Sequence, residues 1–307
     1  MLELFGIKSN LKRSMKKKSV GVVGASGWIG GHLCRALLEK GWKVTGFSRS
    51  DREDDEVAWR RWSGEGEIDL EGLGAVINLA GEAIDQRWTE KHKVDFRKSR
   101  VNLTNELSRS ISNSGVEVLL NASAIGIYGD RGDESLTETT LPGEGYLAGL
   151  CRDWEGAVEV PHRVRTVFLR TGVVLGKGGR AWDKMNGIFK WGIGGKLGDG
   201  KQWMPWIHLK DEIDGMIFAL EKKISGPVNL VAPESVRNAD FTRAVGKAMR
   251  RPTPFSAPAF ALKLLLGDFA KEGLLASTKV VPQVLLDAGY KFHYPTIDEA
   301  MEELVRD

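Results

Sequence analysis

The first half of the chain alternates short apolar runs with amphipathic segments. Continuous apolar runs of this length predict strands buried on both faces, and the helical period of the segments between them predicts helices over 28–41 and 88–113. Strands that alternate with helices in this way are typical of a parallel sheet covered by helices on both sides. The predicted strands span residues 19–25, 43–50, 74–81, 116–124 and 165–176.

The pattern changes after residue 176. A glycine- and tryptophan-rich stretch over 191–208 comes first, and helical patterns follow it. We therefore predict an α/β protein with a doubly wound parallel sheet (a Rossmann fold). A small, mostly helical C-terminal region should lie over the carboxyl edge of the sheet, where such folds bind ligands. The predicted C-terminal helices span 210–222, 238–250, 258–267 and 296–306. The expected organisation is a disordered basic tail (1–18), a nucleotide-binding domain (19–176) and a C-terminal substrate or lid region (177–307) interleaved with the sheet.

The composition is that of a soluble globular protein. Hydrophobic residues make up 42% of the 307 residues and charged residues 28%. No apolar run approaches the roughly 18 residues that a membrane span needs. Six basic residues lie in the tail, and without it the net charge falls from +3 to −2. The body is therefore not basic, and we expect neither a nucleic-acid nor a membrane partner.

The cysteines and histidines narrow the chemistry further. Only Cys34 and Cys151 occur, which argues against a disulfide framework and predicts a reducing, cytoplasmic location. Cys151 lies on a predicted helix, where a small apolar residue is the simpler interpretation than a nucleophile. The five histidines are scattered without the spacing of metal ligands, and we expect no metal.

The sequence GASGWIG carries glycines in the pattern GxxGxxG, at Gly24, Gly27 and Gly30. The motif follows a predicted strand and opens a predicted helix, which is the context that a dinucleotide-binding loop requires. The glycines permit a tight turn, a close approach to a pyrophosphate, and packing of the helix on the strand. The helix N-terminus adds free N–H groups and a positive dipole end. A glycine-rich turn without function is the alternative. The loop also contains Ser26, Trp28 and Ile29.

The end of the second strand predicts which dinucleotide binds. An NAD site places an Asp or Glu about 20 residues after the loop, to bind the ribose 2′-OH. Here the strand ends in Ser48, Arg49 and Ser50. A guanidinium flanked by hydroxyls suits a 2′-phosphate, so NADP is the expected cofactor. Asp51 follows, and its binding of a ribose hydroxyl is the alternative.

Further motifs carry a family resemblance: NLAG (78–81), NASAIGIYG (121–129), Tyr146 and PWIHLKD (205–211). With the glycine loop they resemble the extended short-chain dehydrogenase/reductases. The resemblance is closer to an atypical, NAD-dependent-epimerase-like family with a C-terminal domain of unknown function. That family also shows CRDWE, RTGVVLG and GGKLGDGKQW, and the similarity spans about residues 19–306. It implies NADP(H) binding by the loop glycines, Ser48, Arg49, Leu79, Ala80, Arg100 and Val174.

Several of these residues also have a purely structural interpretation. Leu79, Ala80 and Gly81 end a buried strand, where small residues either let the adenosine ribose approach or only fit the core. Arg100 on the long helix is otherwise a surface charge. The Trp-rich stretch predicts a substrate wall, although its histidine can instead brace the loop. The residues of this wall are Gln202, Trp203, Trp206 and His208.

Tyr146 is the candidate catalytic residue. In the reductase mechanism a lysine one helical turn later lowers the phenol pKa, and here that position is Leu150 in an apolar stripe. We therefore expect Tyr146 to donate a hydrogen bond as a weak acid and to be a poor general base. Ser123 is expected to assist, with a satisfied strand-end hydroxyl as the alternative, because SAIGIYG is one residue longer than the usual SAxxYG. Arg100 and Lys196 are the candidate replacement cations.

Two functions from different classes are compatible with these features. The first is an NADP(H)-dependent oxidoreductase or epimerase on a small carbonyl or nucleotide-linked substrate, and the Trp-rich wall favours it. The second is an NADP(H)-binding redox sensor or scaffold without turnover, and the missing lysine favours it. The sequence indicates neither the substrate and reaction direction nor the oligomeric state.

Overall fold

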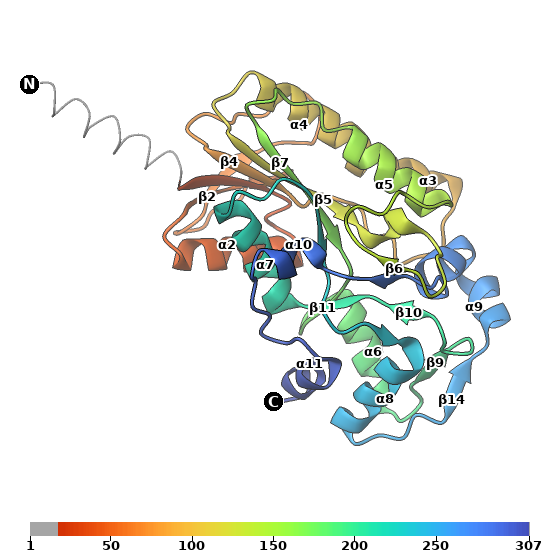
Figure 1. Ribbon diagram of the computed structural model, residues 1–307. Coiled ribbons are helices and arrows are strands. Elements are labelled where there is room, and N and C mark those ends of the chain that lie inside the picture. The colour runs from red at the N-terminus through yellow and green to blue at the C-terminus, as the bar shows by residue number, and fades with distance from the viewer. Residues whose placement is uncertain (1–17, 307) are drawn as a thin grey trace, which may run out of the picture.

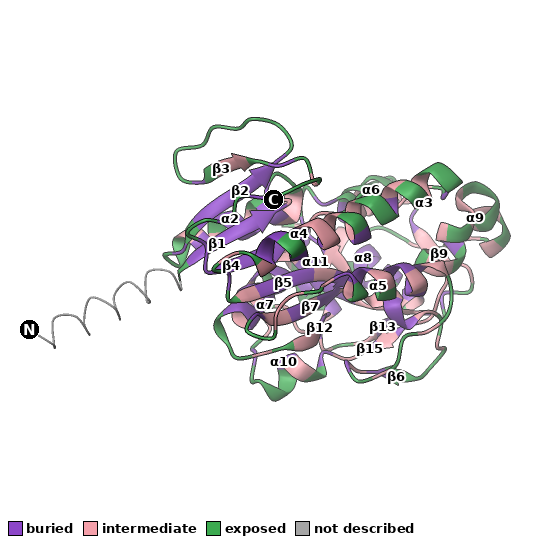
Figure 2. Cartoon of the chain, turned by 90° about the horizontal axis from the view of Figure 1, so that it is seen from above, coloured by how far each residue is buried: buried purple, intermediate pink, exposed green. Residues whose placement is uncertain are grey.

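The structure is a computed structural model that describes residues 18–306, so the predicted tail (1–18) lies outside the described residues except for Lys18. Seven parallel strands form the central sheet, in the order β12-β7-β5-β4-β1-β2-β3 (Figures 1 and 2). Their bounds are β1 Ser19–Val23, β2 Lys43–Ser48, β3 Ala58–Arg61, β4 Ala75–Asn78, β5 Val118–Ala124, β7 Arg165–Thr171 and β12 Gly226–Leu230.

The strand order reverses beside β1. Val20 of β1 lies opposite Val44 of β2 on one side and opposite Ala75 of β4 on the other. The chain adds β2 and β3 in one direction and β4, β5, β7 and β12 in the other. Because all seven strands are parallel, their carboxyl ends meet at one edge, and folds of this type bind ligands there at the reversal. The predicted doubly wound α/β fold is confirmed.

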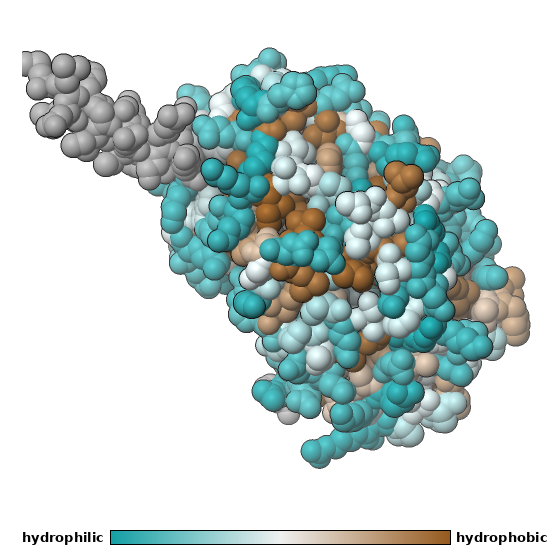
Figure 3. All heavy atoms as spheres, viewed as in Figure 1, coloured by the Kyte–Doolittle hydropathy of each residue, from teal (hydrophilic) through white to brown (hydrophobic). Residues whose placement is uncertain are grey.

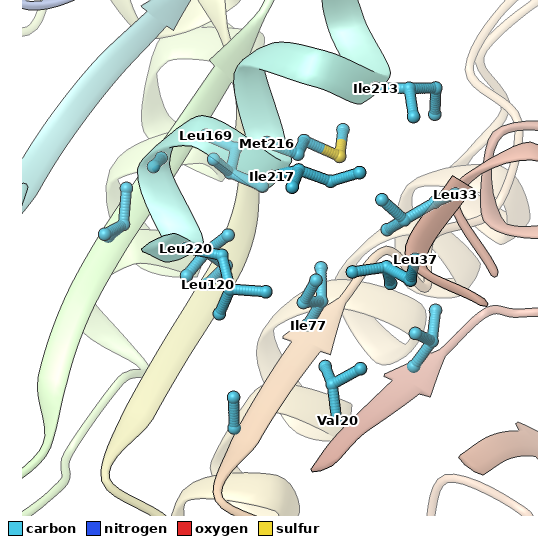
Figure 4. Close-up of a cluster of buried hydrophobic side chains, with 14 of the residues drawn as sticks. Val20, Leu33, Leu37, Ile77, Leu120, Leu169, Ile213, Met216, Ile217 and Leu220 are labelled. Atoms are coloured by element: carbon cyan, nitrogen blue, oxygen red, sulfur yellow. The ribbon is translucent and has the colours of Figure 1, made fainter. Parts of the chain in front are cut away.

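Helices cover both faces of the sheet, and the strands between them are mostly buried (Figure 2). On one face, Leu33 and Leu37 of α2 meet Ile213 and Ile217 of α7 above Ile77 of β4 (Figure 4). Helices α4 and α5 cover the opposite face. The helices are α2 Trp28–Glu39, α3 Glu90–Arg97, the π-helix η1 Lys98–Asn102, α4 Leu103–Ser112, the 3-10 helix η2 Ile125–Tyr128, α5 Tyr146–Gly156, α6 Arg180–Lys190, α7 Leu209–Glu221, α8 Asn238–Met249, α9 Ala259–Leu266, the π-helix η3 Ala270–Leu274, α10 Gln283–Asp287 and α11 Ile297–Leu304.

The C-terminal region has an apolar cluster of its own, in which Trp182 of α6, Phe241 of α8 and Met301 of α11 are buried. Helix α9 buries none of its residues. The surface at its place, on the right-hand edge of Figure 3, has the brown colour of hydrophobic residues. Within residues 18–306, no helix combines the length and the apolar character that crossing a membrane requires. The short strands are β6 Ser135–Leu136, β8 Val173–Leu175, β9 Gly195–Leu197, β10 Trp203–Met204, β11 Trp206–His208, β13 Val236–Arg237, β14 Phe255–Ala257 and β15 Lys279–Val280.

The structure differs from the sequence-based prediction in several places. The predicted strand 165–176 is broken at Gly172: β7 stays in the central sheet, whereas β8 pairs with β11. The predicted helix 88–113 is divided by the π-helical turn η1. Strand β12, from the C-terminal region, completes one edge of the central sheet beside β7 and had not been predicted as a strand. Strand β3 and helix α6 were also not predicted.

Candidate functional site

The glycine loop connects β1 to α2 at the carboxyl edge of the sheet. Gly24 has a φ of 85°, a left-handed conformation that favours glycine. A Cβ on Gly30 would lie 2.2 Å from the Gly24 carbonyl oxygen, so the close contact of helix and loop requires glycine there. Gly27 is the N-cap and has no side chain to bond the N–H groups of the first turn. Ser26 and Gly27 are exposed.

This loop fits the pyrophosphate of a dinucleotide. An N-terminus without a side-chain cap leaves backbone N–H donors for a ligand, and the helix dipole favours a negative charge there. The N–H groups of the first turn of α2, with the Ser26 hydroxyl beside them, would hold the phosphates. The strand–turn–helix geometry agrees with the sequence pattern, and binding of a dinucleotide by this loop stays a prediction.

The carboxyl end of β2 carries the residues predicted to select NADP. Ser48 is buried, and its hydroxyl accepts a hydrogen bond from the Ser50 N–H at 3.3 Å. Arg49 is exposed and forms no ion pair within residues 18–306. The alternative ribose ligand, Asp51, is exposed and lies 3.8 Å from Arg61. A free guanidinium at the end of this strand fits a 2′-phosphate better than a ribose hydroxyl.

Trp28 closes one side of the loop. Its indole Nε1 donates to the Lys177 carbonyl at 3.1 Å, and its ring covers Gly179, where a Cβ would lie 2.4 Å from the ring. Ile29 and Val174 are partly buried and pack against the core cluster between α2 and the sheet. The segment after β8 is thereby fixed against the first turn of α2.

The end of β4 and the helix facing it bring together the next group of predicted residues. Leu79 and Ala80 are partly buried, and a Cβ on Gly81 would lie 3.2 Å from the Arg100 guanidinium carbon. Arg100 donates to the Glu82 carbonyl at 2.9 Å. Its guanidinium also lies 5.1 Å from the centre of the Trp154 ring.

Arg100 therefore faces the sheet edge and is not a surface charge. Burial lowers the pKa of its guanidinium from the usual value. Arg100 belongs to the π-helical turn η1, and π-turns inside α-helices are frequent at functional sites. This turn directs its side chain towards β4.

The Tyr146 side chain turns towards α3. Its hydroxyl donates to the Lys93 carbonyl at 3.3 Å, and its ring centre lies 5.2 Å from that of Trp88. Burial raises the pKa of Tyr146 above its usual value, and the nearby cations Lys93, Arg100 and Arg97 only partly oppose this. The phenol is therefore neutral at pH 7, as expected of a residue without the lysine.

Ser123 uses its hydroxyl for a different partner. It donates to Glu155 Oε1 at 2.7 Å, and Arg170 holds the same carboxylate through bonds of 2.8 and 2.9 Å. Arg170 also donates to the Tyr128 hydroxyl at 3.0 Å. The hydroxyls of Ser123 and Tyr146 thus point to separate networks, and Ser123 has the satisfied strand-end geometry.

Apolar residues of α5 face the loop that follows β5. A Cβ on Gly126 would lie 3.4 Å from the Leu147 side chain. One turn later Cys151 is buried, and burial raises the pKa of its thiol to about 12. Leu150 is also buried in the cluster beneath α5. Cys151 is therefore a core residue and not an activated nucleophile.

The predicted substrate wall does not gather at one place. Gln202 Nε2 donates to the carbonyls of Leu197 and Leu274. Trp203 is partly buried, and its Nε1 donates to Asp133 at 2.7 Å. Trp206 is only 1% exposed and belongs to the C-terminal apolar cluster.

His208 of the same wall caps a helix. Its Nδ1 accepts from the Lys210 N–H at 3.1 Å, at the start of α7, and its Nε2 lies 3.0 Å from Glu303 of α11. Burial lowers the pKa of His208 below its usual value. This is the bracing role that the sequence left as the alternative.

Two residues were missed by the sequence reasoning, Lys93 and Glu212. Lys93 is the cation next to the Tyr146 ring, whereas the candidate Lys196 lies on β9. Glu212 of α7 is completely buried and accepts a hydrogen bond from Thr171 at the end of β7. The only sequence signal for Glu212 was its place between apolar helix positions.

Two protein-family descriptions match this chain. Residues 20–231 match the NAD dependent epimerase/dehydratase family, and residues 257–304 match a domain of unknown function, DUF1731. The chain belongs to this epimerase/dehydratase family, within the extended short-chain dehydrogenase/reductases.

Similar proteins cover nearly the whole chain. An epimerase family protein of Mycobacterium leprae is 39% identical over 95% of this chain and 97% of its own. The human epimerase family protein SDR39U1 (isoform 2), solved with NADPH, has a TM-score of 0.86 at 30% identity over 93% of this chain and 98% of its own. A nucleoside-diphosphate sugar epimerase of Corynebacterium glutamicum has a TM-score of 0.76 at 31% identity, covering 94% of this chain and 58% of its own.

Proposed function

We propose that the chain binds NADP(H) and exchanges hydride between this cofactor and a small carbonyl or nucleotide-linked substrate, as an oxidoreductase or epimerase. One observation carries the proposal: an uncapped helix start at Gly27 lies beside strand β2, and Arg49, directly after this strand, forms no ion pair within residues 18–306. The first suits a pyrophosphate and the second a 2′-phosphate. The human relative solved with NADPH supports the same choice of cofactor.

The cofactor would supply a hydride donor or acceptor at C4 of its nicotinamide. In this proposal Tyr146, as a neutral phenol, donates a hydrogen bond to the substrate oxygen, and Ser123 assists. For this the Tyr146 hydroxyl has to leave the Lys93 carbonyl, and the Ser123 hydroxyl has to leave Glu155.

The second candidate function is NADP(H) binding without turnover, as a redox sensor or scaffold. The specific observation in its favour is the Tyr146 phenol, which has a raised pKa and is bonded to a backbone carbonyl. Binding of the dinucleotide depends on the glycine loop and Arg49, and neither of these depends on the phenol.

A single-turnover experiment separates the two. The chain is mixed with stoichiometric NADPH and a panel of aldehydes, ketones and nucleotide-linked keto sugars, and loss of the reduced-nicotinamide absorbance is followed. An oxidoreductase oxidises the cofactor with at least one class, and Tyr146→Phe slows that oxidation. Tight NADPH binding with no oxidation across the panel would favour the sensor.

A further inference from the structure

Glu212 is a carboxylic acid sealed inside the protein. Its side chain is 0% exposed on the first turn of α7, one turn before the core residue Met216. The Thr171 hydroxyl donates to its Oε1 at 2.9 Å, and its Oε2 has no hydrogen-bond partner within residues 18–306. Burial raises the pKa of Glu212 to about 8, so the carboxyl is mostly neutral at pH 7.

The titratable groups next to Glu212 on α7 and in the C-terminal segment have other partners. Asp211 accepts from the Tyr290 hydroxyl at 3.1 Å and from the backbone N–H of His293 at 2.8 Å. His208 lies against Glu303 on the other side of the helix start. None of them is a cation paired with Glu212.

The sheet and α2 supply no counter-charge either. Arg170 precedes Thr171 on β7, so its side chain lies on the opposite face of the sheet, where it pairs with Glu155. Arg165, at the other end of β7, donates to carbonyls at the end of α7. On α2, Arg35 is exposed. These elements therefore place no cation beside Glu212, and a charged ligand that approaches Thr171 from the sheet edge would shift its protonation.

The proposed cofactor site places the nicotinamide at the sheet edge beside Thr171. Arg49 at the end of β2 would hold the adenosine 2′-phosphate, and the first turn of α2 after β1 would hold the pyrophosphate. The other half of the dinucleotide then extends in the opposite direction, over the ends of β4, β5 and β7. Thr171 is the last residue of β7, lies opposite Ala124 at the end of β5, and both are partly exposed.

We propose that Glu212 is a proton-linked sensor of the cofactor's redox state: it keeps its proton in the empty and NADPH-bound protein and releases it to solvent when NADP⁺ binds above Thr171. The inference rests on the proposed function. The dihydronicotinamide ring is neutral and the oxidised ring carries a positive charge, and a nearby positive charge favours the carboxylate over the acid. The Thr171 hydroxyl donates to Oε1 in both states, and its bond is stronger to the anion.

The coupling has a definite pH dependence. The protein loses one proton from Glu212 as it binds NADP⁺, so NADP⁺ affinity rises by up to tenfold per pH unit below pH 8 and levels off above it. NADPH affinity does not follow this rise. Protonation of the 2′-phosphate affects both forms of the cofactor alike and cancels in their ratio.

The test is isothermal titration calorimetry of the full chain with NADP⁺ and NADPH, in buffers of different ionisation enthalpy at pH 7. The dependence of the heat on the buffer gives the number of protons released. The variant is Glu212→Gln, which is neutral and of the same shape. The control is Glu138→Gln, which changes another buried carboxyl with a raised pKa and an unpartnered oxygen, bonded to the Asn229 and Val284 N–H groups.

We expect the native chain and Glu138→Gln to release more protons with NADP⁺ than with NADPH, and Glu212→Gln to release equal numbers with both. Equal release in the native chain, with both nucleotides bound, would overturn the inference and leave the proposed function standing. A difference that persists in Glu212→Gln would overturn it as well. Failure of both nucleotides to bind would overturn the proposed function itself.

Discussion

Replacing Glu212 by Gln should change how the stability of the protein depends on pH. The carboxyl has a pKa of about 8 in the folded protein, against 4.5 for an ordinary glutamate. Because the folded-state pKa is the higher one, the folded state binds an extra proton between these two values. The stabilisation from that proton is fully present below pH 4.5 and is lost as the pH rises through 8.

The size of the effect follows from the difference between the folded-state and unfolded-state pKa values. Each pH unit corresponds to about 1.4 kcal/mol of differential stability, so the loss reaches about 3 kcal/mol by pH 7 and about 5 kcal/mol above pH 8. Glutamine carries no titrating proton and removes this slope. Its amide N–H₂ faces the position of the unpartnered Oε2, which adds a constant penalty of about 1–3 kcal/mol. The test therefore uses the slope against pH of the difference in unfolding free energy between Glu212→Gln and the native chain. The constant part of that difference does not report on the titration of Glu212.

The assay is urea unfolding of the native chain and of Glu212→Gln at a series of pH values from 5 to 9. We expect the free energy of unfolding of the variant to gain on that of the native chain with rising pH and to level off above pH 8. Glu302→Gln, an exposed change on α11, serves as the control and should give a flat difference. A flat difference for Glu212→Gln would refute the reasoning, because it would mean that the buried carboxyl titrates as it does in the unfolded chain.

The remaining predictions concern the tyrosine, its helix and the loop glycines. Tyr146→Phe should leave NADPH affinity within about twofold by tryptophan fluorescence quenching, because the phenol bonds a backbone carbonyl; a tenfold loss would place it in the cofactor site. Leu150→Lys should lower the free energy of unfolding by about 1–3 kcal/mol, because it puts an amine into a buried cluster; an unchanged urea midpoint would contradict that burial. Gly179→Ala should destabilise by about 1–3 kcal/mol, because its Cβ would lie 2.4 Å from the Trp28 ring, and unaltered thermal unfolding would show that the ring can move aside.

Local chemistry made the conformation of the proposed cofactor loop predictable. The turn at Gly24, the contact at Gly30 and the position of Arg49 after a strand depend on residues close together in sequence, and each left a pattern there. The same holds for the strands of the first half, whose continuous apolar runs reflect burial on both faces.

Long-range contacts decided what the sequence did not predict. The apolar run 165–176 continues past Gly172 without a break in the pattern. Its second half leaves the central sheet because β8 pairs with β11. Trp206 lies in the core because α6, α8 and α11 pack around it. Glu212 lies in a stretch that reads as a polar helix start, and its burial depends on α7 packing against the sheet.

The central claim is that the chain is built to bind NADP(H), and Arg49 tests it most directly. A charge-assisted bond to the 2′-phosphate contributes about 1.5–3 kcal/mol, which corresponds to roughly 10- to 100-fold in affinity. Titration of NADPH and NADH by tryptophan fluorescence should show that preference in the native chain and in Lys40→Asp, an exposed charge reversal at the far end of α2. Arg49→Asp should abolish or reverse the preference while NADH binding persists. Equal affinities for NADPH and NADH in the native chain would contradict the account.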